Sequence, residues 1–125
     1  MRGMFECCSS LKSVSFNQFN SNYLDDIAYL FLDCISLQSI SFSGFNPNDI
    51  RYMEGLFYNC ISLTSIDLSH LFTENVRNMS SMFYNCYSLN YSNIYEFNTT
   101  NVVDMSFMFY NCTSLKTLDL TNFDT

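Results

Sequence analysis

The sequence predicts an α/β solenoid of five 26-residue repeats, with a parallel sheet on the concave face and short helices on the convex face. Three observations predict this fold class. Columns of identical residues recur every 26 positions, apolar residues alternate in one short segment of each repeat, and apolar residues recur at helical spacing in another. Each repeat is therefore expected to contribute one strand and one short helix.

The repeat is the strongest pattern in the chain, because four columns hold one residue type through all five copies without an insertion. These columns are Phe5, Phe31, Phe57, Phe83 and Phe109; Cys8, Cys34, Cys60, Cys86 and Cys112; Ser10, Ser36, Ser62, Ser88 and Ser114; and Leu11, Leu37, Leu63, Leu89 and Leu115. The 125 residues thus form a single array, with repeats at about 1–23, 24–49, 50–75, 76–101 and 102–125. We expect a piece of a longer array without capping repeats, since the chain opens inside one repeat and stops inside another.

The strand is predicted from the third copy of the repeat. Ile66 and Leu68 alternate as in a strand, and Leu63 enters that strand from the preceding turn. The spacing L-x-x-L-x-L is typical of leucine-rich repeats. Residues 71–75 are mostly polar and are expected to form a loop.

The helix is predicted from the apolar residues that follow this loop at one-face helical spacing. They are Val76, Met79, Met82, Phe83 and Cys86. Asn85 stands near the end of this stretch, where a left-handed residue would terminate a helix. Strands neighbour each other at about 4.8 Å and helices at about 8–10 Å, so the stack is expected to bend with the strands on its concave side.

Composition excludes several function classes. The net charge is −7, with only five Lys and Arg residues, which argues against binding nucleic acid or an anionic membrane through charge. No run approaches the roughly 18 apolar residues of a membrane span, so membrane insertion is not expected. The segment from Met1 to Cys8 lacks the apolar core of a signal peptide.

The cysteine column has three interpretations: small apolar residues in the core, a disulfide ladder, or metal ligands. Zinc motifs need cysteine pairs two to four residues apart, and only Cys7 and Cys8 are close in sequence. Disulfides need converging Cβ vectors, whereas stacked repeats set the side chains parallel. We favour the apolar interpretation and expect no metal and no cofactor, and we expect Cys7 to be exposed and reactive.

Catalysis is not expected. A serine nucleophile needs a nearby base, and the only histidine, His70, has no partner that the repeat would supply. His70 is interpreted as a solvated loop residue, and the serine column as structural. No catalytic residue is therefore assigned.

The outward positions of the strands are the favoured binding residues, although a merely soluble face would show the same small polar side chains. The candidate binding residues are Lys12, Gln38, Thr64, Asn90 and Lys116; Ser65, Tyr91 and Thr117; Asp67, Asn93 and Asp119; and Tyr95. Tyr91 and Tyr95 stand out, because aromatic residues on a polar face are enriched at binding hot spots. A second column, Tyr58, Tyr84 and Tyr110, is interpreted mainly as half-buried packing at the edge of the stack.

The segments MSSMFYNCYSL at Met79–Leu89 and MSFMFYNCTSLKTLDLTNFDT at Met105–Thr125 resemble the BspA-like leucine-rich repeats. More narrowly, they resemble the variant found in mycoplasma surface proteins of unknown function. The resemblance covers the whole chain, and the fourth copy departs most, at Tyr91–Ile94. It implies a surface-exposed or secreted protein that adheres to host proteins or to other cells, and a longer parent chain. It implies no catalytic residue.

Two functions remain open from the sequence. The favoured one is a protein-binding or adhesion module that recognises a protein or cell-surface ligand, host ligands included, through its concave face. The alternative is a structural array or spacer that self-associates through open ends of the stack. An enzyme is least favoured, because the titratable residues are dispersed.

Overall fold

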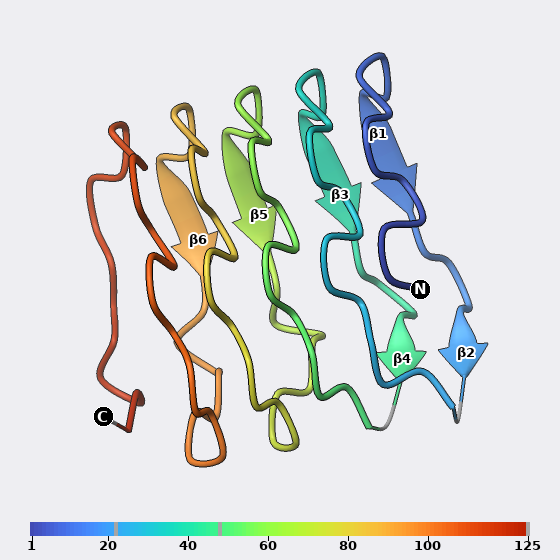
Figure 1. Cartoon of the computed structure of the whole chain (residues 1–125), viewed down its shortest axis with the longest axis vertical. Coiled ribbons are helices and arrows are strands. Elements are labelled where there is room, and N and C mark those ends of the chain that lie inside the picture. The colour runs from blue at the N-terminus through green and yellow to red at the C-terminus, as the bar shows by residue number, and fades with distance from the viewer. Residues whose placement is uncertain (22, 48, 125) are drawn as a thin grey trace.

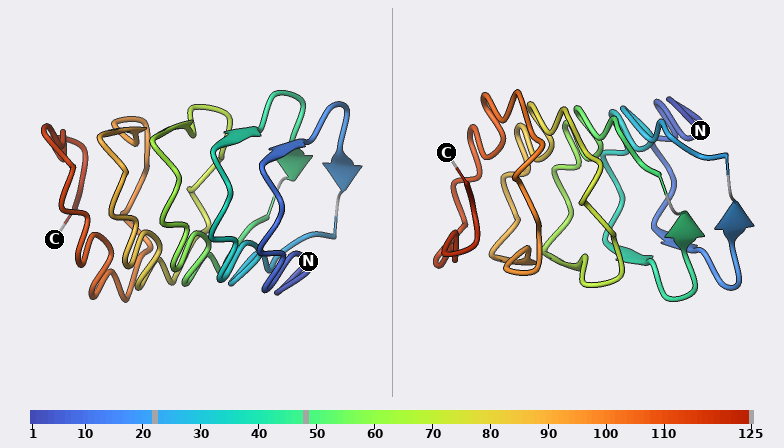
Figure 2. Two further views of the ribbon diagram at one scale, coloured as in Figure 1. Left: turned by 90° about the horizontal axis from the view of Figure 1, so that it is seen from above. Right: turned by 90° about the horizontal axis from the view of Figure 1, so that it is seen from below.

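The computed structural model describes residues 1–21, 23–47 and 49–124, and in it the chain winds into successive coils that lie side by side (Figures 1 and 2). Its strands are β1 (Ser13–Ser15), β2 (Asn20–Ser21), β3 (Ser39–Ser41), β4 (Asn46–Pro47), β5 (Ser65–Asp67) and β6 (Tyr91–Asn93). All strand pairs are parallel, and they form three two-stranded sheets, β1 with β3, β2 with β4 and β5 with β6. Each coil is one 26-residue repeat, since Ser13 pairs with Ser39 and Ser65 with Tyr91.

The predicted helices are wrong. Among the residues that the structure describes there is no helix, and the stretch predicted to be helical runs through consecutive tight turns. In repeat 4, the N–H groups of Tyr84 and Cys86 donate to the carbonyls three residues earlier, at 3.1 Å each. Other N–H groups of this stretch donate to the next coil instead: Ser81 to Ser106 at 2.8 Å, Phe83 to Met108 at 2.8 Å and Asn85 to Tyr110 at 2.9 Å. Backbone bonding therefore alternates between the same coil and the next one.

The spacing between coils explains why turns replace helices. The ring centroid of Phe57 lies 5.8 Å from that of Phe31 and 5.4 Å from that of Phe83, which belong to the repeats on either side. This matches the spacing of neighbouring strands, about 4.8 Å, and is far below the 8–10 Å that packed helices need. Turns that bond directly to the next coil fit this spacing. The bend predicted from a strand–helix mismatch thus loses its physical basis, and the fold is not an α/β solenoid with a helical convex face.

The turns depend on two columns of residues with left-handed backbone. One column holds Gly3, Tyr29, Gly55, Ser81 and Phe107, and the other holds Cys7, Asp33, Asn59, Asn85 and Asn111. The left-handed conformation expected at the asparagines is confirmed, but it belongs to stacked turns and ends no helix. Asparagine and aspartate tolerate this conformation because their short polar side chains bond locally.

The amide side chains of the second column form a ladder along the stack. Asn59 donates from Nδ2 to Asp33 Oδ1 at 2.6 Å, Asn85 to Asn59 Oδ1 at 2.8 Å, and Asn111 to Asn85 Oδ1 at 3.0 Å. Every bond runs in the same direction, from the later repeat to the earlier one. The ladder therefore adds one hydrogen bond between side chains to each step from repeat 2 to repeat 5.

The core lies between the strand segments and the stacked turns. Its centre is fully buried and includes Phe57, Leu63, Met79, Phe83 and Leu89. The same columns are only partly buried in the first and fifth repeats, as at Phe5 and Phe109. None of the described residues forms a helix that is long and apolar enough to cross a membrane.

Buried threonine hydroxyls continue the bonding between repeats where strands are absent. Thr73 Oγ1 donates to the Asn98 carbonyl at 3.2 Å and accepts from the Asn98 N–H at 2.8 Å. Thr99 accepts the N–H of Asp124 at 2.7 Å in the same manner. The predicted loop of repeat 3 is therefore tied to its neighbour by side chains, whereas repeats 1 and 2 pair through β2 and β4 in the corresponding segment.

The cysteines of the inner repeats are buried free thiols with a hydrogen-bonding role. Cys60 Sγ donates to the Phe31 carbonyl at 3.2 Å and Cys86 Sγ to the Phe57 carbonyl at 3.1 Å. The burial expected from the apolar interpretation is confirmed for Cys34, Cys60 and Cys86. Cys7 is exposed, as predicted.

These thiols predict a loss of stability in alkali. Burial raises the pKa of Cys34 and Cys112 to about 11, from 9.0, and also raises the pKa of Cys60 and Cys86. The folded chain holds these protons more tightly than the unfolded chain. For Cys34 and Cys112, the contribution to stability is therefore complete below pH 9 and is lost between pH 9 and 11, by about 1–3 kcal/mol per thiol.

Urea unfolding at pH 8 to 11 under reducing conditions measures this effect. The double variant Cys34→Ala/Cys112→Ala is the control, because tyrosines and lysines also titrate in this range. It should lose less stability than the parent between pH 9 and 11. Equal losses in the two proteins would show that these thiols are not responsible.

Candidate functional site

The candidate binding residues lie in or directly beside β1, β3, β5, β6 and residues 116–119. These segments follow one another along one side of the coils, which we call the strand face (Figure 1). All twelve predicted residues are exposed except Asn93, which is half-buried. The stack does not bring all of them together. Lys12 belongs to the first coil and Lys116 to the fifth, so these two lie at opposite ends of the face (Figure 1).

Repeats 4 and 5 bring one group of predicted residues around a single cavity, which we call the tyrosine hollow. Its volume is about 370 Å³. Its lining residues are Tyr91, Ser92, Tyr95, Thr117, Leu118 and Asp119. Tyr91 and Tyr95 are 51% and 45% exposed, so both rings are available for contact.

Ser92, one of the lining residues, carries a buried hydroxyl that nothing in the described chain satisfies. Ser92 Oγ has no hydrogen-bond partner, and neither has the neighbouring Asn93 Oδ1. Ser92 stands in a column that is apolar in the other repeats, as at Ile66 and Leu118. A buried polar group without a partner costs about 1–3 kcal/mol, so Ser92 makes this strand locally less stable than an apolar residue would.

The carboxylates of the strand face are held in their charged form. The pKa of Asp67 is lowered first by the Ser69 N–H, which donates to its Oδ1 at 3.0 Å, and less by Asn93, which donates at 3.2 Å. Hydrogen bonds from the Thr121 hydroxyl and N–H lower the pKa of Asp119. This part of the face therefore presents fixed negative charge and hydrogen-bond acceptors.

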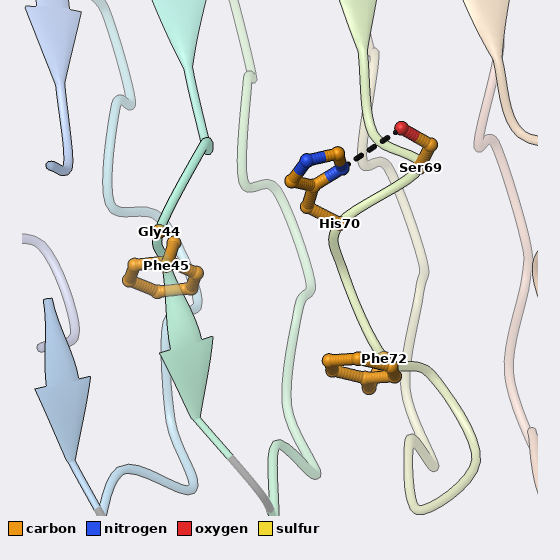
Figure 3. Close-up of a pocket in the computed structure, with 5 residues that line it drawn as sticks. All are labelled: Gly44, Phe45, Ser69, His70 and Phe72. Atoms are coloured by element: carbon orange, nitrogen blue, oxygen red, sulfur yellow. Dashed lines mark hydrogen bonds between the residues drawn. The ribbon is translucent and has the colours of Figure 1, made fainter. Parts of the chain in front are cut away.

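His70 lies exposed, as the solvated-loop interpretation expects, but it also lines a second cavity of about 440 Å³ (Figure 3). Its Nδ1 lies 3.0 Å from Ser69 Oγ. A relay would need a carboxylate on the other ring nitrogen, whereas the bonded oxygen of Asp67 accepts from the Ser69 backbone and from Asn93. This serine–histidine pair thus lacks the arrangement of a hydrolytic triad.

Phe72, which also lines this second cavity, was missed from the sequence. It is 57% exposed and stands in a column that holds asparagine at Asn20, Asn46 and Asn98. An aromatic residue in a column that is otherwise polar is the signal that could have identified it. A large exposed aromatic residue beside a cavity marks a surface that can bind.

The second tyrosine column is a continuous stack. Tyr84 lies with its ring centroid 4.5 Å from Tyr58 and 4.7 Å from Tyr110. Tyr58 and Tyr84 are half-buried, which confirms the packing interpretation for them, and Tyr110 is exposed. Tyr84 has a tyrosine ring on each face, so only its edge and its hydroxyl group are open to contact.

Metal ligation has no candidate in the described ranges. No group of three or more His, Cys, Asp or Glu side chains among residues 1–21, 23–47 and 49–124 is placed to hold a metal ion.

Comparison with known proteins identifies a family for this chain. No curated protein and no solved structure matches the chain. A family described as "Mycoplasma protein of unknown function, DUF285" matches twice, over residues 1–69 and 64–125. The two matches together span the repeat array, and the chain belongs to this family of mycoplasma-type repeat proteins of unknown function.

Proposed function

We propose that the chain is a protein-binding or adhesion module of a cell-surface or secreted protein, and that the strand face carries recognition. The observation that carries the proposal is the tyrosine hollow, where two half-exposed rings flank a cavity with an unsatisfied buried hydroxyl. Aromatic residues beside a desolvated pocket are the usual anchors of protein interfaces. The surface location rests on the resemblance to BspA-like surface proteins.

The proposed mechanism is recognition by side chains over several adjacent coils. The parallel register brings Ser65 beside Tyr91 and Asp67 beside Asn93, so a ligand that crosses the coils meets a different set of side chains at each step. Many weak contacts of this kind give specificity without a deep pocket. Repetition along a longer array would add avidity.

A structural, self-associating array is the second candidate function. Along the stacked turns, each coil donates backbone hydrogen bonds to the next coil and accepts them from the previous one: Phe57 donates to Met82, and its neighbour Leu56 accepts from Phe31. The same bonds can join two coils of different chains. Concentration-dependent association of the chain would favour this candidate.

Binding of the chain to a panel of extracellular-matrix proteins, host cells and glycans tests the proposal. The double variant Tyr91→Ser/Tyr95→Ser should bind at least about tenfold more weakly, because it removes both aromatic anchors. Tyr87→Ser is the matched control, since Tyr87 is 42% exposed but lies beside the stacked turns. The control should bind as the parent does.

Each other outcome points elsewhere. Equal binding by the parent and the double variant would exclude the tyrosine hollow as the binding site. The column of Tyr58, Tyr84 and Tyr110 would then be the next site to test. Absence of binding to the whole panel, together with self-association in sedimentation, would favour the structural array over adhesion.

A further inference from the structure

The stack has a junction between repeats 2 and 3. β1 pairs with β3 and β5 with β6, but β3 and β5 form no strand pair in the part of the chain that the structure describes, although they are neighbours (Figure 1). β4 likewise has its partner in β2, while residues 72–73 form no strand. The sheet is therefore interrupted at the same step in both segments.

A change of turn conformation accounts for this junction. After the strands of repeats 1 and 2, Gln18 and Gly44 have left-handed backbone, with φ of 60° and 80°. The corresponding residues of the later repeats, His70 first among them, do not. A Cβ on Gly44 would meet the Gln18 nitrogen at 2.7 Å, so this turn packs directly against the turn of repeat 1 and tolerates no side chain.

Two cavities meet at His70 and form what we call the junction groove. The larger, about 440 Å³, is lined by Gly44, Phe45, Ser69, His70 and Phe72, and the smaller, about 120 Å³, by Ile40, Ser41, Phe42, Ser43, Asp67 and His70. Phe42 and Phe45 are buried. The His70 and Phe72 rings extend from repeat 3 toward the segment that carries Phe45 (Figure 3).

The chemistry of the groove suits a flat cation. No lysine or arginine lines it, and the chain as a whole carries a net charge of −7. Asp67 uses Oδ1 for its hydrogen bonds to Ser69 and Asn93, which leaves Oδ2 for a ligand. Phe72, 57% exposed, presents a ring to the same groove, and aromatic faces attract guanidinium groups.

The chain already holds one of its own arginines in this manner. The Arg2 guanidinium carbon lies 4.9 Å from the centre of the Tyr29 ring. Its Nη1 lies 3.3 Å from Asp26 and 2.8 Å from Glu54. An aromatic ring beside carboxylates is thus a combination that this fold uses to hold a guanidinium.

We propose that the junction groove binds an arginine side chain presented by a protein partner, with the guanidinium on the Phe72 ring and paired with Asp67. This inference rests on the proposed protein-binding function and specifies the chemistry of the partner. The Ser69–His70 pair shapes the groove between the ring and the carboxylate. Arginine suits it better than lysine, because its planar group can stack and pair at once.

The test is a titration of the isotope-labelled chain with acetyl-Gly-Arg-Gly-amide, followed by backbone and aromatic chemical shifts. Weak binding is expected, with shift changes confined to residues 40–45 and 67–72. The peptide with citrulline in place of arginine should bind at least about fivefold more weakly, because it keeps the shape and loses the charge. The lysine peptide should also be weaker.

Four variants separate the two contacts from general effects. Asp67→Asn keeps an acceptor for Ser69 but loses the charge, and Phe72→Leu keeps apolar bulk but loses the ring; each should reduce affinity severalfold. Glu74→Gln and Phe107→Leu make the same chemical changes at exposed sites outside the groove, and they should bind as the parent does.

The proposal is overturned if the citrulline peptide binds as well as the arginine peptide, or if Asp67→Asn leaves the affinity unchanged. Stronger binding of a neutral methyl glycoside at the same residues would also overturn it, in favour of a carbohydrate site. Failure here is distinguishable from failure of the proposed function. If the arginine peptide does not bind but Tyr91→Ser/Tyr95→Ser still weakens binding to a ligand of the panel, only the arginine assignment is wrong and the protein-binding function stands.

Discussion

Replacing Phe57 by alanine is expected to lower the free energy of unfolding by about 3–5 kcal/mol and the melting temperature by about 10–20 °C. Phe57 is fully buried in the middle repeat. Its ring stacks on Phe31 and Phe83 and meets the edge of Phe42 at 6.4 Å. The cavity left by alanine cannot close, because the backbone bonds on both sides hold the coils at their spacing.

Phe72→Ala is the matched control for this substitution. It removes the same side chain from the same repeat, but Phe72 is 57% exposed. Its stability should stay within about 0.5 kcal/mol of the parent. Urea unfolding followed by far-ultraviolet circular dichroism measures both variants, and equal losses would mean that the central phenylalanine stack does not hold the array together.

Replacing Asn85 by aspartate is expected to destabilise the chain by about 2–3 kcal/mol. In the amide ladder Asn85 donates to Asn59 and accepts from Asn111. Aspartate can only accept, so its carboxylate would face the Asn59 oxygen without a proton between them. The left-handed backbone at this position suits both residues, so the effect isolates the hydrogen bond.

Asp33→Asn tests the direction of the ladder with the reverse substitution. Asp33 stands at the start of the ladder, where its Oδ1 accepts from Asn59 and its Oδ2 has only the Cys7 thiol, a weak donor at 4.0 Å. Asparagine keeps that acceptor, so this variant should remain within about 0.5 kcal/mol of the parent. Urea unfolding at pH 7 compares Asn85→Asp with Asp33→Asn. Equal losses of stability in the two variants would show that the amide ladder does not stabilise the stack.

The candidate site could be predicted from the sequence only where it breaks the repeat visibly. Tyr91 and Tyr95 stood out as aromatic residues in polar columns, and the structure places both at the tyrosine hollow. Phe72 departs from its column just as clearly, but without coordinates it could be assigned to packing or to a loop. The junction groove depends on the conformation at Gly44, which no pattern of residue types specifies.

The sequence by itself determined the 26-residue coil, the buried columns and the side chains that face outward from the strands. These follow from apolar periodicity alone, because each apolar column must be covered by the next copy of itself. The tertiary structure decided what forms opposite the strands. The spacing i, i+3, i+6, i+7 and i+10 at Val76–Cys86 is compatible with a helix and with successive tight turns.

The distance between coils resolves that ambiguity. Strand pairing and ring stacking set neighbouring coils close together, as the 4.5 Å between Tyr58 and Tyr84 shows, and a helix is too wide to repeat at that interval. Turns whose N–H groups bond alternately within the coil and to the next coil satisfy the backbone at this spacing. The contact between repeats, and not the pattern within one repeat, therefore determines this half of the fold.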